Sequence, residues 1–242
     1  IPYTDVTFLV NGSAVKLNLD LTNVDTYDQM WTAIQNGFNL AKAGAYSSSL
    51  ANVTITRSEG TDDFTSKDGL ARVADEYVLN IENGTITWKY TNLVKYNGAM
   101  YYVDRSMVRW DYKGLVEKDG TLYYVSNSMV DYQYKGLYEY NNKYYYVENG
   151  QVNKNYNGIC KYNSKNYYVT NGVVDPQYTG VVESGKDLLY VKKGVVDESY
   201  TQLTYYNNNW YYFEKGSVNW DYSNLIYYNN AWYYVDHGYI NW

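Results

Sequence analysis

The last two thirds of the chain repeat with a period of 22 residues, and this regularity constrains the fold more than any other feature. The tripeptide Tyr101-Tyr102-Val103 returns in six later copies, intact or with one conservative change, and no copy contains an insertion. A second tyrosine series opens the copies at Tyr90, Tyr112, Tyr134, Tyr156, Tyr178, Tyr200 and Tyr222. Units of this length stack on their neighbours, because one unit alone cannot bury a core.

Each copy, numbered from one at its first tyrosine, predicts a β-hairpin. Residues 137–140 and 144–147, for example, are two runs of β-prone residues on either side of a short polar stretch. That stretch contains pairs such as Asn97-Gly98 and Asp119-Gly120, which tolerate the positive φ of a tight hairpin turn. A glycine-containing turn and a short Val-Asn or Val-Asp connector follow. The tyrosine at position thirteen, present in all seven copies, is expected to be scaffold whose rings stack as a ladder.

The region before the repeats predicts a small α+β domain with the element order β-β-α-β. Residues 6–10 and 14–19 flank the turn Asn11-Gly12-Ser13, and residues 52–57 alternate as a third strand. A polar loop over 59–67 then leads to strands near 77–88.

A helix is expected between the second and third strands. It begins at Asp25 or Thr26, which can cap it, and Gly44 is a plausible end. Its apolar side consists of Tyr27, Met30, Trp31, Ile34, Phe38 and Ala41, of which Met30 and Trp31 are interpreted as core.

The fold class is therefore mainly β: a β-hairpin solenoid of seven 22-residue repeats preceded by a small α+β domain. Residues 1–76 form the α+β domain and residues 77–242 the solenoid. Residues 79–86 lie in register one period before the first copy, so residues 77–89 are predicted to be a degenerate cap unit before the seven repeats of 90–242.

Composition excludes several classes of function. The net charge of −6 argues against nucleic acid and anionic membranes as partners, and no apolar run is long enough for membrane insertion. A single cysteine and a single histidine exclude a disulfide framework and multi-cysteine metal sites. The first residues do not read as a signal peptide but as the start of a trimmed fragment.

No catalytic residue, metal site or cofactor is expected, and the chain is interpreted as a protein that is not an enzyme. Its carboxylate pairs, Asp62-Asp63, Asp75-Glu76 and Asp197-Glu198, are neighbours in sequence rather than separate groups facing a cleft. No phosphate-binding loop, nucleophile elbow or Ser-His-Asp arrangement occurs. His237 is interpreted as solvated surface and Cys160 as an apolar core position.

Two segments carry a resemblance to a known family. Residues 210–216, Trp-Tyr-Tyr-Phe-Glu-Lys-Gly, and residues 232–238, Trp-Tyr-Tyr-Val-Asp-His-Gly, resemble the core of Gram-positive choline-binding and glucan-binding repeats. The resemblance covers 90–242 and implies a β-hairpin solenoid on the bacterial surface, secreted or bound to the cell wall. It also implies ligand clefts between adjacent hairpins. In the choline-binding pattern the Trp of Gly-Trp is one wall of the cation cage, and this chain has Gly114-Leu115 there, so choline is not expected as the ligand.

The candidate ligand-binding residues are those that vary on the constant scaffold. Flat aromatic rings stack on the apolar faces of sugars, and tryptophan is concentrated at two variable positions of the last copies. The candidates are Trp210, Trp220, Trp232 and Trp242, the pair Trp88 and Trp110 near the first domain, and Tyr144 at the position of Trp210. The alternative, that these tryptophans cap the open end or fill the core, stays open.

The resulting hypothesis is a non-catalytic extracellular module that binds a polysaccharide or cell-wall glycan. Many shallow sites on one chain would raise its overall affinity for the polymer through avidity. A second hypothesis is an adhesin or immunoglobulin-binding factor whose tyrosine-rich face contacts a host surface protein. A third is a spacer that presents the first domain.

Overall fold

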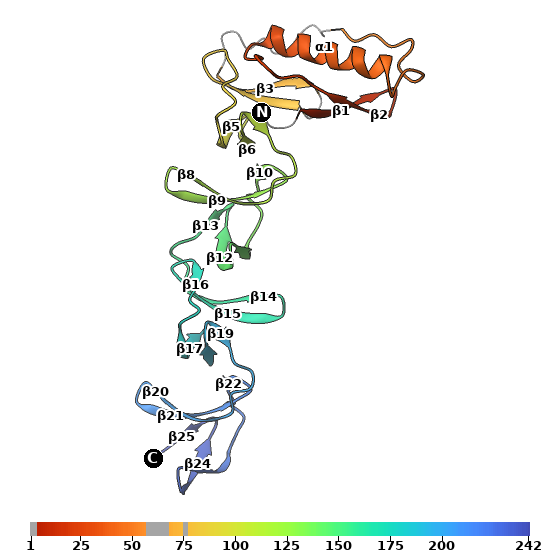
Figure 1. Cartoon of the computed structure of the whole chain (residues 1–242). Helices are drawn as coiled ribbons and strands as arrows, with labels where there is room; N and C mark the ends of the chain where they lie inside the picture. The colour runs from red at the N-terminus through yellow and green to blue at the C-terminus, as the bar shows by residue number, and fades with distance from the viewer. Residues whose placement is uncertain (1–3, 57–67, 75–76) are drawn as a thin grey trace. The chain divides into compact units, whose positions relative to one another are not determined.

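The structure, a computed structural model, describes residues 4–56, 68–74 and 77–242 (Figure 1). Contacts divide the chain into two units, Ile1–Asp131 and Tyr132–Trp242, and each is described by itself. The predicted polar loop over 59–67 lies outside the described residues.

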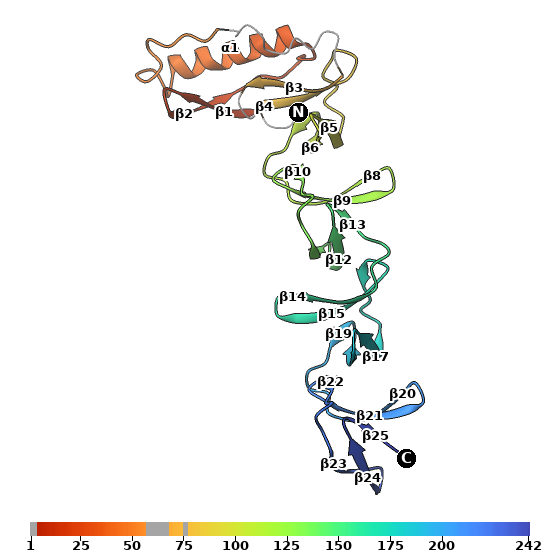
Figure 2. The same ribbon diagram turned by 180° about the vertical axis from the view of Figure 1, so that it is seen from behind.

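The first unit contains one helix and ten strands within its described residues. They are β1 Asp5–Val10, β2 Ser13–Asn18, α1 Tyr27–Ala43, β3 Gly69–Ala74, β4 Tyr77–Ile81, β5 Asn92–Tyr96, β6 Ala99–Asp104, β7 Met107–Val108, β8 Gly114–Lys118, β9 Thr121–Ser126 and β10 Met129–Val130. Figures 1 and 2 show α1 along one side of strands β1 to β4.

Helix α1 confirms the predicted helix and its ends. The Thr26 hydroxyl accepts a hydrogen bond from the Gln29 amide at 3.3 Å, and the Gln29 side chain accepts one from the Thr26 amide at 3.1 Å. This reciprocal capping box satisfies amides that the first turn leaves without helical partners. Gly44 follows the last helical residue. On the apolar side Met30, Ile34 and Phe38 are buried, whereas Trp31 is half-buried.

The predicted strand over residues 52–57 is wrong within the described residues, since 53–56 have no strand pairing. The backbone of Val53 is occupied in another way: its amide donates to the Leu50 carbonyl at 3.0 Å, and its carbonyl accepts from the Lys42 ammonium at 2.9 Å. The apolar alternation serves packing instead, because Val53 and Ile55 lie against the core of the first unit.

The core of the first unit joins the helix region to the start of the repeats. Beside residues of β2 and α1 it contains Leu79 and Ile81 of β4, and Met107 of β7. Strands β3 and β4 form an antiparallel hairpin, and Leu79 pairs with Met107. The boundary predicted between residues 76 and 77 falls inside this hairpin. The start of the solenoid at residue 77 stays a prediction.

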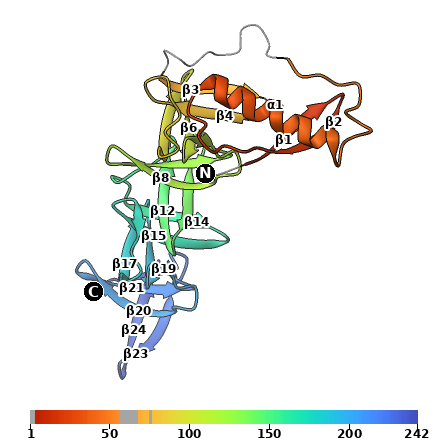
Figure 3. The same ribbon diagram turned by 45° about the horizontal axis from the view of Figure 1, so that its top comes forward.

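The second unit contains fifteen strands. They are β11 Gly136–Tyr140, β12 Lys143–Glu148, β13 Gln151–Val152, β14 Gly158–Tyr162, β15 Lys165–Thr170, β16 Val173–Val174, β17 Thr179–Ser184, β18 Asp187–Lys192, β19 Val195–Val196, β20 Gln202–Tyr206, β21 Asn209–Glu214, β22 Ser217–Val218, β23 Asn224–Tyr228, β24 Ala231–Asp236 and β25 Tyr239–Ile240. Each repeat is thus a hairpin followed by a two-residue strand where the sequence indicated only a connector. Successive hairpins run crosswise, as β20–β21 and β23–β24 show in Figure 3.

The two-residue strands hold neighbouring repeats together. Tyr145 of β12 pairs with Val173 of β16, and Tyr167 of β15 pairs with Val195 of β19 in the same register. The long second strand of a hairpin therefore pairs with its own partner, its own short strand and the short strand of the next repeat. This continuous pairing confirms the predicted β-hairpin solenoid.

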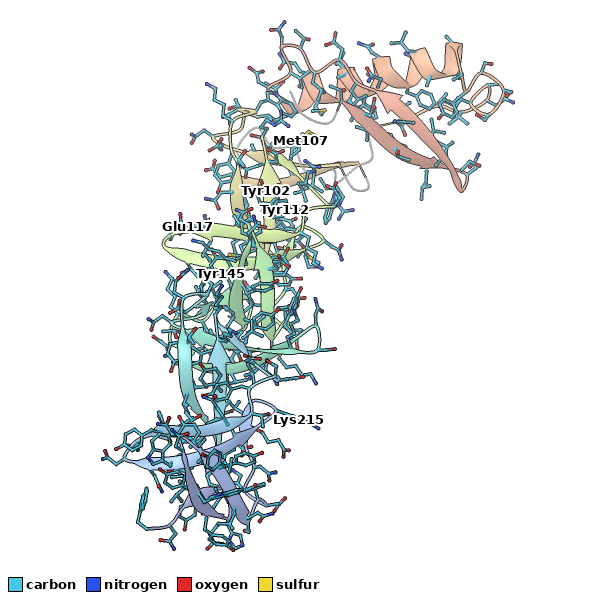
Figure 4. All side chains as sticks on the ribbon, turned by 60° about the horizontal axis from the view of Figure 1, so that its bottom comes forward. Tyr102, Met107, Tyr112, Glu117, Tyr145 and Lys215 are labelled. Atoms are coloured by element: carbon cyan, nitrogen blue, oxygen red, sulfur yellow. The ribbon has the colours of Figure 1, made fainter. Side chains whose placement is uncertain are left out.

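The repeated tyrosines form the expected ladder. The ring at position thirteen lies against the ring that opens the next repeat, and Tyr102 and Tyr112 stack with centroids 3.8 Å apart (Figure 4). The opening tyrosine also donates a hydrogen bond within its own repeat, from Tyr156 to the Ile159 carbonyl at 2.9 Å for example. Both residues of most hairpin turns have positive φ, as in Asn97-Gly98, which confirms the predicted turn chemistry.

Candidate functional site: aromatic clusters between adjacent hairpins

Aromatic side chains gather where one hairpin faces the next, and they come from four positions of the repeat. Position eleven of one hairpin meets positions seven, twelve and twenty-one of the following repeat. Clusters of this kind with ring contacts are named here after one of their members. The Trp110 cluster lies in the first unit, and the Tyr144, Trp220 and Trp210 clusters lie in the second.

The Tyr144 cluster consists of three tyrosines around an open cleft. The ring centroids of Tyr144 lie 5.6 Å from Tyr162 and 5.0 Å from Tyr167. The cleft beside them has a volume of about 490 Å³. Its walls are Asn142, Lys143, Tyr144, Tyr167, Thr170, Val173, Val174, Asp175, Pro176, Lys193 and Val195. Burial, together with the nearby Tyr167 and Glu139, raises the pKa of Tyr144 to about 12, so its phenol stays protonated.

The Trp220 cluster combines rings with carboxylates. Trp220 and Tyr211 meet edge to face with centroids 6.0 Å apart, and Tyr206 packs against the same core. The Trp220 indole donates to the Asp187 carboxylate at 2.8 Å, and the Tyr206 hydroxyl donates to Glu183 at 3.3 Å. The Trp220 side chain is 37% exposed. Two acidic groups therefore border an accessible aromatic surface.

The Trp210 cluster contains two tryptophans and two tyrosines. Trp210 lies 5.5 Å from Tyr228, and Trp242 meets Tyr233 edge to face at 6.1 Å, centroid to centroid. Both tyrosines and Trp210 pack on a core that contains Leu203. Trp242 is 83% exposed. The sequence-predicted Trp210 and Trp242 thus belong to one cluster.

Trp232 occupies the position of Trp210 one repeat later. Its side chain is 66% exposed and contacts Tyr227, with ring centroids 5.3 Å apart. It is an exposed aromatic platform rather than a wall of one of the four clusters.

The Trp110 cluster faces the degenerate hairpin. Trp110 and Tyr101 meet edge to face at 6.1 Å, and Tyr101 meets Tyr96 at 6.5 Å. They line a cleft of about 200 Å³ together with Val78 and Arg72.

Trp88 lies apart from these clusters. Its ring packs against the core of the first unit, and its indole donates to the Val24 carbonyl at 2.5 Å. The residue also has a positive φ of 58°. These contacts join the repeat array to the segment before α1.

Positions seven and twelve supply cluster residues that the sequence analysis did not single out. They are Tyr96, Tyr162, Tyr206 and Tyr228 at position seven, and Tyr101, Tyr167, Tyr211 and Tyr233 at position twelve. Position seven carried only a partial signal. It is Tyr in all four clusters and Lys118 or Ser184 in two other repeats, but it is also Tyr at Tyr140, which belongs to none of the four clusters.

Position four, which gave the expectation against choline, does not line the clusters. At this position Leu93, Leu115, Leu137 and Leu203 are buried, Ile159 and Val181 are half-buried, and Leu225 of the last repeat is exposed. This chain has an aliphatic residue at position four where the choline-binding pattern has tryptophan. The aromatic clusters do not depend on that tryptophan, because their rings come from other positions.

The remaining polar candidates form no group with evident chemistry in the described residues. His237 is exposed and lies 2.8 Å from Asp236, and Cys160 is half-buried against the core beside Leu137, which raises the pKa of its thiol. Within the described ranges no three His, Cys, Asp or Glu side chains are grouped as metal ligands. No described helix is long and apolar enough to cross a membrane. Asp62-Asp63 and Asp75-Glu76 fall outside the described residues.

Comparison with known proteins identifies the repeats. Residues 111–131, 133–153 and 155–175 match the family model of the choline-binding repeat. These three repeats are therefore similar to the choline-binding repeat, in agreement with the resemblance seen in the sequence. No curated protein matches it.

Three solved structures show more distant similarity. CbpJ from Streptococcus pneumoniae TIGR4 is 18% identical over 78% of this chain and 74% of its own, with a TM-score of 0.30. CbpF in complex with ipratropium is 18% identical over 68% of this chain and 57% of its own, with a TM-score of 0.27. An alternansucrase in complex with isomaltotriose is 18% identical over 63% of this chain and 13% of its own, with a TM-score of 0.28.

Proposed function

We propose that this chain is a non-catalytic module of the bacterial surface that binds cell-wall carbohydrate through the aromatic clusters between adjacent hairpins. The observation that carries the proposal is the recurrence of these clusters: rings from neighbouring repeats meet at equivalent positions, with accessible faces at Trp220 and Trp242. Ring faces accept the apolar C–H faces of sugars, and nearby amides and hydroxyls bond sugar hydroxyl groups.

Repeated clusters suit a polymer better than a small molecule. Each cluster is shallow, so one sugar unit gains little when it binds alone. A polysaccharide that occupies several clusters in turn converts later contacts into intramolecular ones, and its avidity exceeds the affinity of any single site. Because the proposed ligand belongs to the cell wall, we propose that the module lies outside the cell. We also propose that residues 1–76 form a distinct α+β domain.

Co-sedimentation with insoluble polymers tests the proposal. The full 242-residue chain is mixed with insoluble α-glucan or with purified Gram-positive cell wall, and the bound fraction is measured against protein concentration. We expect retention on at least one polymer. Trp210→Ala is expected to weaken it about tenfold, since an aromatic anchor in a binding site contributes on the order of 1–2 kcal/mol.

Leu40→Ala is the matched control, because Leu40 is an exposed apolar side chain on α1. Equal retention of the Trp210→Ala and Leu40→Ala proteins would contradict the assignment of the Trp210 cluster. No retention on any wall polymer would contradict the proposal itself, and capture of a host protein after glycosidase treatment would favour the adhesin hypothesis.

Choline is a second candidate ligand, favoured by the family match and by the Trp220 cluster. A quaternary ammonium is attracted by aromatic faces and by nearby carboxylates, and Trp220, Tyr206 and Tyr211 lie beside Glu183 and Asp187. Calorimetric titration with choline is expected to give heat that Asp187→Asn reduces. Asp221→Asn removes an equal charge from a residue outside the clusters and serves as the control.

A further inference from the structure

The Tyr144 cleft is built from three successive repeats. Lys143 and Tyr144 come from β12, and Tyr167 comes from β15 of the next repeat. The turn before β19, in the repeat after that, provides Lys193. The pairing of Tyr167 with Val195 holds this turn beside β15, and the Gly194 carbonyl accepts from the Tyr168 amide at 2.9 Å.

Two lysines therefore line this aromatic cleft: Lys143 from the first of the three repeats and Lys193 from the third. In the part of the chain that the structure describes, neither Lys143 nor Lys193 is held in an ion pair, whereas Lys135 lies 2.6 Å from Glu148. The lining of the cleft contains one carboxylate, that of Asp175, whose Oδ1 accepts a hydrogen bond from the Gln177 amide at 2.9 Å. The carboxylate of Glu139 lies beside the Tyr144 phenol but is not part of the lining, so within the lining two ammonium groups stand against one carboxylate.

The other clusters of the second unit differ at the same repeat positions. Asp187 replaces Lys143 in the Trp220 cluster, and Asn209 replaces it in the Trp210 cluster. The chain as a whole carries −6, so the excess of lysine in the lining of this cleft is a local feature and not a reflection of overall charge. A neutral glucan has no group that needs two ammonium ions, and a quaternary ammonium would be repelled by them.

We propose that the Tyr144 cleft binds an anionic sugar unit, with its ring on Tyr144 and Tyr167 and its phosphate or carboxylate between Lys143 and Lys193. This inference rests on the proposed carbohydrate-binding function and assigns a substrate class to one cleft. The shared chemistry is a sugar-based polymer with an anionic group beside a ring. A phosphorylated polymer and a uronic acid polymer both have that chemistry.

Affinity electrophoresis of the full chain tests the assignment. The gels contain dextran, phosphorylated dextran of the same length, or polygalacturonate, and retardation gives a dissociation constant for each polymer. The native protein is expected to bind at least one anionic polymer more tightly than dextran. The double variant Lys143→Gln, Lys193→Gln is expected to lower the ratio of anionic to neutral affinity roughly fivefold to tenfold. The two anionic gels separate phosphate from carboxylate as the preferred group.

A charge-matched control is available one repeat later. Lys165 and Lys215 occupy the same repeat positions as Lys143 and Lys193, but Asn166 stands where the cleft has Tyr144. Lys165→Gln, Lys215→Gln is expected to change the ratio less than twofold. Equal effects of the two double variants, or equal affinity of the native protein for all three polymers, would overturn the anionic cleft and leave the proposed function standing. Failure to bind any of the polymers, together with no retention on cell wall, would overturn both.

Discussion

The rings of Tyr190 and Tyr200 lie parallel, with their centroids 3.5 Å apart and 5° between their planes. Tyr190 is at position thirteen of one repeat, and Tyr200 opens the next. Burial raises the pKa of the Tyr190 phenol, so this phenol stays uncharged well above neutral pH. This contact is the clearest example of the tyrosine ladder that joins the repeats.

Removal of the Tyr200 ring is expected to destabilise the chain by about 3 kcal/mol, because both the stack and the edge contact with Phe213 are lost. Tyr200→Phe keeps the ring and loses the hydroxyl contacts with Thr204 at 2.8 Å and Gln202 at 2.6 Å, with an expected cost of about 1 kcal/mol. Urea unfolding midpoints of Tyr200→Ala and Tyr200→Phe measure the difference. Equal midpoints would show that the hydroxyl, not the stack, stabilises this junction.

Helix α1 provides a local prediction. Thr26→Ala removes the hydroxyl that accepts from the Gln29 amide, and the expected cost is about 1 kcal/mol. Thr26→Ser retains the hydroxyl and is expected to stay within a few tenths of a kcal/mol of the native protein. Amide hydrogen exchange of the first helical turn is the measurement. Unchanged protection in Thr26→Ala would contradict the capping role.

Alkaline pH is expected to weaken the fold through Tyr144. The pKa of this phenol is about 12 in the folded chain against 10.0 for an ordinary tyrosine, so the neutral form is favoured by folding. The associated stability is fully present below pH 10 and is lost as the pH rises through about 12. Unfolding midpoints between pH 9 and 12 measure it. Tyr144→Phe cannot ionise and is expected to lose less stability over this interval, whereas parallel curves for the two proteins would contradict the prediction.

The repeat register predicts the outcome of deletions. Excision of residues 156–177 removes one whole period, so Tyr178 follows position twenty-two of the preceding repeat and every later strand keeps its inward face. We expect this shortened chain to stay folded, since each repeat contacts only near neighbours. Excision of residues 156–176 leaves one residue too many at the junction and disturbs the inward alternation of the strands next to it. Circular dichroism and the urea midpoint distinguish the two, and equal stability would refute strict register.

The period predicted most of the repeat fold, because residues with identical spacing repeat the same local geometry. It did not predict the short strands such as β16, since two residues carry no alternation and their pairing depends on a neighbour one repeat away. The prediction of a strand over 52–57 was wrong for a related reason. Alternating apolar residues also suit an extended segment that packs on a core without strand pairing.

The sequence located part of the candidate site. Trp210, Trp220, Trp242, Trp110 and Tyr144 all belong to aromatic clusters, because a variable aromatic position on a constant scaffold tends to face a neighbour. Their partners at position twelve are Tyr in every repeat except the one with Leu189, so this position varies too little to mark a cleft ring. Trp88 has scaffold contacts that depend on Val24, far away in the sequence.

The pairing of Tyr145 with Val173 and of Tyr167 with Val195 follows one rule along the array, and this has a consequence for the gene. Any two repeats present compatible junctions, so recombination between their coding segments joins one unit to another without a mismatch. Lineages can therefore lengthen or shorten the array by single genetic events. Each event adds or removes an aromatic cluster with its own neighbouring charges, while the scaffold persists.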